Sequence, residues 1–90
     1  MTTRYDRRLI APAGELDFDT APAAFDPHMV ADAGSVVVDL SGVTFVDAYA
    51  LGKLVELRDI LAERGGSLVV VGASARVART FSLAKLDSLL

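Results

Sequence analysis

Side chains that could carry out catalysis are few in this chain, and they are scattered. Asp17, Asp39 and Asp47 are the acidic candidates for proton transfer, and His28 or Lys53 would have to be the basic group beside them. Nucleophilic and acid–base catalysis require a nucleophile and a base in a positioned set. The chain has one histidine and no cysteine, and its serines form no recognisable hydrolytic set. We therefore predict a protein that is not an enzyme and has no metal site and no cofactor.

The clearest local chemistry is at Asp47, which stands directly before an apolar run of helical spacing. A carboxylate at this position can accept hydrogen bonds from the amides of Tyr49 or Ala50. It also interacts favourably with the positive end of the helix dipole. Asp47 is therefore predicted to begin a helix, and this capping function alone would account for its presence.

The outward side of that predicted helix has a distinctive composition. Its residues on a helical wheel, away from the apolar stripe, are Tyr49, Gly52, Lys53, Glu56, Asp59 and Glu63. A large aromatic side chain, a glycine that permits close approach and a pair of opposite charges are typical of a protein-docking face, although ordinary solvated helices are also charged. We call Asp47, Tyr49, Gly52, Lys53 and Glu56 the docking face and predict partner binding there.

The elements that must position this face form a βαβ unit. Residues 36–40 and 68–71 are continuous β-branched runs, which favour parallel central strands covered on both faces. Between them, Ala48 to Arg64 has apolar residues at helical spacing, and Gly65-Gly66 supplies a helix-ending conformation. The segment between the first strand and this helix is predicted to be a turn followed by the short apolar pair Phe45-Val46.

The rest of the chain is predicted to complete the same layer structure. Residues 9–13 and 14–16 indicate a bent strand pair at the sheet margin, and Thr20 is predicted to cap a helix that kinks or stops before Pro27. Ser74 is predicted to cap a last helix toward Leu83, with Val77, Phe81 and Leu83 or Ala84 facing inward. Residues 72–74 could also hold an anion at the start of this helix, but a plain turn followed by a helix cap is the favoured interpretation.

Composition narrows the class of partner. The chain has 90 residues, of which 52% are apolar, and its formal charge is −3, so we predict a single folded domain over residues 1–90. No basic stripe suited to nucleic acid is present. No stretch approaches the roughly 20 apolar residues of a membrane span, and no signal peptide precedes the domain. We expect a cytoplasmic protein with a protein partner and no membrane insertion.

Four ordered motifs resemble the STAS family, the sulphate transporter and anti-sigma factor antagonist domain. Residues 39–54 resemble its signature, in which Asp-Leu-Ser precedes an aromatic residue and Asp-Ser-Ser-Gly-Leu. Residues 14–17 are similar to its Gly-Glu-Leu-Asp, 65–68 to its glycine turn, and 77–87 to its third helix and the following Gly-Leu-Asp. The resemblance extends over nearly the whole chain from Leu9. It implies a STAS-like, mainly parallel mixed sheet with helices packed on it.

The resemblance also implies how such a domain would act. In bacterial antagonists of this family, a serine-kinase anti-sigma factor phosphorylates the serine before the glycine and is thereby released. Tyr49 occupies that serine position here, with Ala48 and Ala50 beside it, whereas Asp47, Leu51 and Gly52 keep the pattern. A phosphate there would add nearly two negative charges to the docking face. We therefore expect binding of an anti-sigma factor without serine phospho-switching.

Three further points are left open by the resemblance. One alternative function is a STAS subunit that regulates the ATPase of a lipid or anion transport system. Lys85 replaces a family glycine after the third helix, so either its backbone is strained or the helix runs on. The last family helix could also be lacking after Leu90, which would expose apolar surface and favour a homo-oligomer.

Overall fold

Five strands are interspersed with helices along residues 7–90, which are the residues described by the computed structural model. This order confirms the predicted α/β class. The elements are β1 (Arg7–Ile10), β2 (Ala13–Leu16), α1 (Ala21–Ala24), the 3₁₀ turn η1 (Pro27–Val30), β3 (Ser35–Asp39), β4 (Gly42–Val46), α2 (Ala48–Ala62), β5 (Ser67–Val71), α3 (Ala75–Leu83) and the 3₁₀ turn η2 (Asp87–Leu89).

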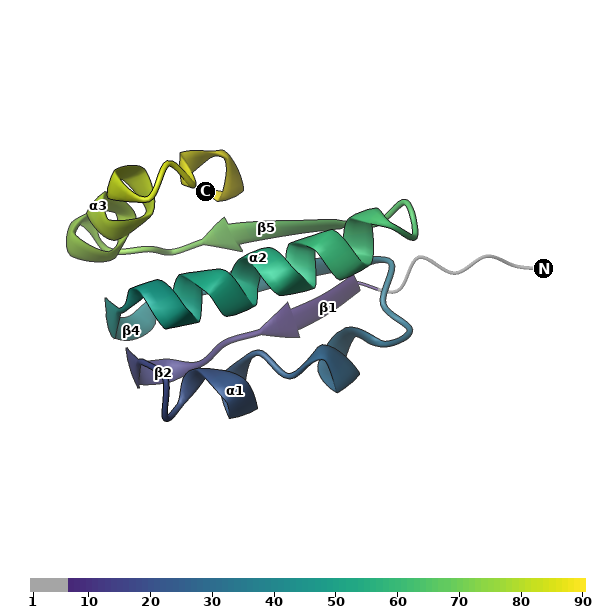
Figure 1. Cartoon of the computed structure of the whole chain (residues 1–90), viewed down its shortest axis with the longest axis horizontal. Helices are drawn as coiled ribbons and strands as arrows, with labels where there is room; N and C mark the ends of the chain where they lie inside the picture. The colour runs from purple at the N-terminus through teal and green to yellow at the C-terminus, as the bar shows by residue number, and fades with distance from the viewer. Residues whose placement is uncertain (1–6) are drawn as a thin grey trace.

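The strands form two parallel sheets. One has the order β1-β3-β5, and the other pairs β2 with β4. The predicted parallel pairing of the two β-branched strands is confirmed, because β3 pairs directly with β5. Figure 1 shows α2 in front of the strands, with α1 on one side of it and α3 on the other. Buried side chains from both sheets and all three α-helices belong to one hydrophobic cluster.

The prediction that the central strands are covered on both faces is wrong. Burial alternates along β3 and β5: Val36, Val38, Leu68 and Val70 are buried, whereas the residues between them are half-buried or exposed. Successive side chains in a strand point to opposite faces of the sheet. The valine runs therefore contain a core-facing set and an outward-facing set, which their composition alone does not distinguish.

Residues 42–46 also differ from their prediction. They form the strand β4, not a turn with a short apolar pair, and they pair in parallel with β2. The turn is limited to Leu40 and Ser41, where the amide of Val43 donates to the Leu40 carbonyl at 2.9 Å. The predicted bent pair at the sheet margin corresponds to β1 and β2, which lie in different sheets and do not pair with each other. The pairing of β2 with β4 has a register irregularity between Gly14 and Glu15. β4 delivers the chain directly to the start of α2.

The helix between β4 and β5 ends two residues earlier than Arg64. Its buried side is Ala50, Leu51, Leu54, Leu57 and Leu61, as the apolar stripe predicts, although Val55 is only half-buried and Ala62 is exposed. Gly65 has the left-handed φ of 77°, which suits a residue without a Cβ atom. The Gly66 amide donates to the Leu61 carbonyl at 2.8 Å and closes the helix end.

The first helix is short, and its predicted cap is wrong. Thr20 precedes α1, but its hydroxyl makes no cap hydrogen bond. The hydroxyl instead donates to the Glu15 carbonyl at 2.8 Å and accepts from the Asp17 amide at 2.9 Å. The helix stops at Ala24, before Pro27, as predicted from the missing proline donor.

The last α-helix begins as predicted and differs at its end. The Ser74 hydroxyl accepts from the Val77 amide at 3.1 Å, and Val77 and Phe81 are buried. Leu83 and Ala84 are exposed, so the prediction that one of them faces inward is wrong. The helix stops at Leu83 because the backbone turns at Lys85, whose φ is 61°. Of the two alternatives for Lys85, the strained backbone is the one observed.

Candidate functional site

Asp47 joins the end of a strand to the start of α2. Its Oδ1 atom accepts a hydrogen bond from the Ala50 amide at 2.8 Å, so the capping prediction is confirmed with Ala50 as the donor. The Asp47 amide donates to the Leu16 carbonyl at 3.1 Å. The same residue therefore fixes the helix start against the end of β2. The first turn of α2 is held in a defined position at this edge of the β2–β4 sheet.

The docking face lies on the outer side of α2 from this point. Tyr49 is 48% exposed, and Gly52 and Glu56 are also exposed. A Cβ atom built on Gly52 would meet nothing within 4 Å. Gly52 therefore marks a flat place on the helix that a partner surface could approach closely. Asp59 and Glu63 continue the same exposed side farther along the helix.

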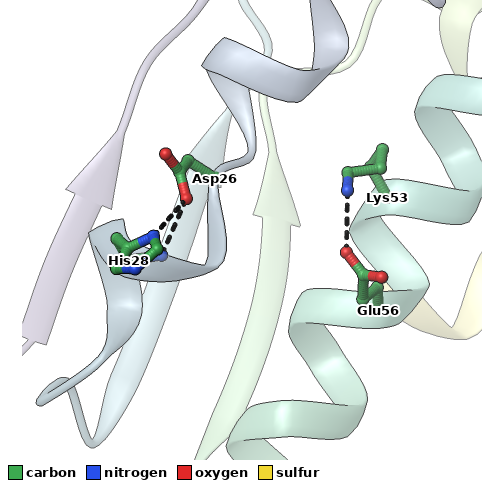
Figure 2. Close-up of polar contacts among 4 residues, drawn as sticks. All are labelled: Asp26, His28, Lys53 and Glu56. Carbon is green, nitrogen blue, oxygen red and sulfur yellow. Dashed lines mark hydrogen bonds and ion pairs between the residues drawn. The ribbon is translucent and has the colours of Figure 1, made fainter.

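Lys53 is less free than the other members of the docking face. Its ammonium nitrogen lies 2.8 Å from Oε1 of Glu56, and its side chain is only 21% exposed (Figure 2). The hydrogen bond to Glu56 raises the pKa of Lys53 above its ordinary value, against the opposing effect of desolvation. The positive charge is therefore engaged within the helix and already matched by a carboxylate.

A second polar pair, Asp26 and His28, lies at the start of η1 (Figure 2). Asp26 Oδ1 accepts from the His28 amide at 2.9 Å and lies 3.0 Å from the His28 ring nitrogen Nδ1. The amide hydrogen bond is the main cause that lowers the pKa of Asp26, and the positive charge of Lys53 contributes slightly. The sequence analysis did not single out Asp26, because only the packing of η1 on α2 brings it near Lys53.

The candidate catalytic residues do not converge. Asp17 Oδ1 accepts from the amides of Asp19 and Thr20, and Asp39 Oδ1 accepts from the amide and hydroxyl of Ser41. His28 pairs with Asp26, and its side chain is 95% exposed. Each of these carboxylates accepts hydrogen bonds within its own local turn. None of the contacts links Asp17, Asp39 and Asp47 to one another.

Two exposed phenylalanines lie close to the docking face along the strand ends. Phe45 is 38% exposed on β4 and pairs in register with Glu15 of β2. Phe18 is 66% exposed and follows the end of β2, which the Asp47 amide contacts at Leu16. Sequence reasoning missed Phe18 because it is far from Asp47 along the chain. The only signal was that Gly-Glu-Leu-Asp, the motif before it, belongs to the same family pattern.

Several kinds of site are absent from residues 7–90. No three acidic or histidine side chains lie where they could hold a metal ion. The surface of these residues has no pocket. None of their helices has the length and apolar character needed to cross a membrane. The candidate site in the described part of the chain is therefore an exposed surface.

Comparison with known proteins shows the family to which this chain belongs. Residues 1–90 match the STAS domain family, and the chain belongs to it. The anti-sigma-B factor antagonists of Listeria monocytogenes and Listeria innocua are each 32% identical over 81 residues, which is 87% of this chain and 71% of theirs. The predicted family is thereby confirmed, and this chain is similar to regulators named as anti-sigma factor antagonists.

Solved structures show the same fold. The anti-sigma factor antagonist SpoIIAA in its unphosphorylated form superposes with a TM-score of 0.84, covering 99% of this chain and 81% of that one at 15% identity. The STAS domain of a SulP transporter from Vibrio cholerae gives 0.73, covering 98% and 70% at 21% identity. The mainly parallel STAS architecture is therefore confirmed.

Proposed function

We propose that this chain is an anti-sigma factor antagonist that binds a serine-kinase anti-sigma factor through the docking face. The observation that carries this proposal is the exposed Tyr49 beside the open Gly52, on a helix start fixed by Asp47. An aromatic side chain on a positioned element contributes large contact area at low entropic cost. The two Listeria relatives, named for antagonism of an anti-sigma-B factor, support this class of partner.

Binding by this chain is not switched off by serine phosphorylation. The segment from Asp47 to Gly52 contains no serine or threonine, and Tyr49 stands at the family's phosphoserine position. The nearest upstream hydroxyl, on Thr44, lies within β4, and Ser41 donates its hydroxyl to Asp39 at 2.6 Å. These groups are fixed in the strand and the preceding turn. The complex would therefore persist in the presence of ATP.

Exposed Phe18 and Phe45 extend the docking face along the adjoining strand ends. Their apolar surface, together with Tyr49, would supply the hydrophobic part of the interface. Lys53 and Glu56 already neutralise each other at 2.8 Å, so they would lie at the rim, where an intact ion pair need not lose its water entirely. We expect Tyr49 to dominate the affinity and the ion pair to influence specificity.

A second candidate function is the regulation of a transport ATPase by a STAS subunit. The likeness to the SulP transporter domain is the observation in its favour. That likeness is at 21% identity, compared with 32% for the antagonists of Listeria. Binding of purified transport ATPase subunits from the native host, with no binding of anti-sigma factors, would favour this alternative.

The direct test is binding of each serine-kinase anti-sigma factor of the native host, purified, to the unchanged chain and to three variants. Tyr49→Glu and Gly52→Arg should each weaken binding at least tenfold, because one removes the aromatic contact and the other fills the flat place on α2. Glu63→Lys is the matched control, since it changes an exposed residue at the far end of the same helix. Equal affinity for all four proteins would refute the docking face.

The absence of a serine switch has its own test. Incubation with ATP and the bound kinase should leave the unchanged chain without phosphoserine and the complex intact. The control variant carries Ala48→Ser, Tyr49→Ser and Ala50→Gly, which restores the family motif. We expect this variant to gain one phosphate and to be released. Stoichiometric serine phosphorylation of the unchanged chain would contradict the proposal.

A further inference from the structure

The side of the β1-β3-β5 sheet away from α2 is an uncovered surface, which we call the open face. It consists of the outward-pointing residues of the pleat: Arg7, Leu9, Ser35, Val37, Asp39, Ser67, Val69 and Val71. The opposite face of the same sheet is packed, since Val36, Val38, Leu68 and Val70 are at most 7% exposed. Helices therefore cover only one side of the sheet in the described part of the chain.

An apolar row crosses the middle of the open face. The strand register places Leu9 beside Val37, and Val37 beside Val69. Leu9 is 65% exposed and Val69 is 41% exposed, and Val71, next along β5, is 44% exposed. Such a row on three adjacent strands is a contiguous patch of the kind that marks an interaction surface.

The charges on the open face lie at its two ends. Arg7 begins β1, and its register partner on β3 is Ser35, whereas Asp39 lies at the opposite end of β3. Both hydrogen bonds from Ser41 end on Oδ1 of Asp39, at 2.9 and 2.6 Å, so Oδ2 is the oxygen left to accept from another donor. The face has a positive end, an apolar middle and a negative end.

This arrangement is complementary to itself. Consider two copies whose open faces are stacked. A two-fold axis midway between the sheets, parallel to both and crossing the strands at the level of Val37, reverses the strand direction of the second sheet. The apolar row then meets the same row of the other copy. Arg7 comes opposite the end of the partner sheet that holds Asp39, one strand away, and the symmetry forms this contact twice. Sheets stack about 10 Å apart, a distance that arginine and aspartate side chains span together.

We propose that the open face is the interface with a second copy of this chain, forming a symmetric dimer. The apolar row supplies the buried centre, and two Arg7–Asp39 ion pairs set the orientation. Three short strands give an area below the roughly 800 Å² per partner of a standard stable interface, so the dimer is a weak one. The docking face on α2 is on the packed side of the sheet and remains accessible in this dimer.

Sedimentation of the purified chain from micromolar to millimolar concentration tests the proposal. We expect a reversible monomer–dimer equilibrium. Val69→Lys should weaken the dimer at least tenfold, because it places two lysines in the apolar centre. Leu83→Lys is the matched control: Leu83 is 78% exposed on α3 and is not part of the open face, so this variant should dimerise normally. Circular dichroism confirms that both variants are folded.

A charge exchange tests the orientation. Arg7→Asp and Asp39→Arg should each weaken the dimer, and the double variant should recover most of the loss. Tyr49→Glu should leave dimerisation unchanged, which separates this interface from the docking face. A chain that stays monomeric at millimolar concentration, or a dimer weakened by Tyr49→Glu and not by Val69→Lys, would overturn the proposal. Failure of anti-sigma factor binding would leave these measurements unaffected.

Discussion

At the scale of single residues, Asp47 combines a structural function with a place in the proposed interface. Its carboxylate caps α2 through the Ala50 amide, and its backbone amide fixes the helix start against Leu16. A binding defect in an Asp47 variant could therefore arise from a displaced helix start. Tyr49 and Gly52 make no such bonds, so their variants report on the surface more directly.

Substitution of Asp47 separates its cap from its charge. We expect Asp47→Ala to lower the free energy of unfolding by about 1 kcal/mol, the typical cost of a lost N-cap. Asp47→Asn should retain most of that free energy, because its side-chain oxygen can still accept from the Ala50 amide. Urea denaturation of the three proteins measures the difference. An equal loss in both variants would show that the charge, not the cap hydrogen bond, stabilises the helix start.

The carboxylate of Asp39 gives a prediction about pH. The hydrogen bond from the Ser41 hydroxyl is the main cause that lowers the pKa of Asp39 below 3.8, and the Ser41 amide adds to it. A group whose pKa is depressed in the folded state contributes stability above its unfolded pKa, and that stability is lost as the pH falls through the folded value. The Asp39 contribution should therefore be complete above about pH 5, decrease as the pH falls toward 3.8, and disappear only below the folded pKa, which is lower than 3.8.

Carboxyl NMR titration of Ser41→Ala checks this assignment. In this variant the pKa of Asp39 should rise toward 3.8, because the Ser41 hydroxyl, whose hydrogen bond lowers that pKa most, is removed. Asp26 is an internal control, since the His28 amide is the main cause of its own lowered pKa. A parallel rise of both pKa values would mean that the substitution acts through general loosening of the fold.

At the scale of elements, α2 carries the docking face on its exposed side, which does not contribute to the packed core. Gly52 lies in the interior of this helix, where glycine is unfavourable, and a Cβ atom there would meet nothing within 4 Å. We expect Gly52→Ala to increase the free energy of unfolding by about 0.5–1 kcal/mol. Thermal unfolding measures this gain. Destabilisation would indicate that the glycine is needed for the fold and is not simply a feature of the surface.

Arg64, just beyond the end of α2, is hydrogen-bonded to the end of η1. Its Nη2 donates to the Val30 carbonyl at 2.7 Å, and its Nη1 donates to the Ala31 carbonyl. Replacement by methionine should cost about 1.5–3 kcal/mol, the usual range for hydrogen bonds to a charged group. Arg58→Met is the matched control, because Arg58 contacts only its exposed neighbour Asp59 at 3.3 Å among described polar partners. Equal free energies of unfolding for the two variants would show that the hydrogen bonds of Arg64 do not stabilise the fold.

The elements also show what the sequence can and cannot predict. The start of α2 followed from its aspartate cap and apolar stripe, and its end was predicted to within two residues from Gly65, because each of these signals acts over a few residues. β4 was missed because Ser41 and Gly42 are typical turn residues, and only the pairing with β2 defines a strand from Gly42 onward. The open face was missed for a similar reason: valines facing the core and valines facing outward look alike until the helices are placed.

The candidate site was predictable to the same extent. Asp47, Tyr49 and Gly52 could be assigned to one helix start, because helical periodicity fixes their relative positions. Lys53 and Glu56 are three residues apart in the sequence, and they were predicted as a mixed-charge pair on the same side of the helix. Phe18 and Asp26 reach this region only through the pairing of β2 with β4 and the packing of η1 on α2. Such contacts depend on topology, which local patterns do not specify.

At the scale of the whole molecule, one core joins the two sheets. Phe81 of α3 is fully buried, and α3 packs against β4, while α2 packs against β5. The buried side chains of these elements belong to the same cluster. The two sheets should therefore unfold together in one transition, although they are not hydrogen-bonded to each other as one sheet.

Phe81→Ala tests this unity. The substitution should cost about 3–5 kcal/mol, a large share of the roughly 5–13 kcal/mol expected for a chain of this length. Leu83→Ala, two residues away and 78% exposed, should stay within about 0.5 kcal/mol of the unchanged chain. Urea unfolding followed by circular dichroism and by tyrosine fluorescence should give coincident curves for all three proteins. If the curves separate for Phe81→Ala, α3 and β4 unfold independently of the β1-β3-β5 sheet and the single core is refuted.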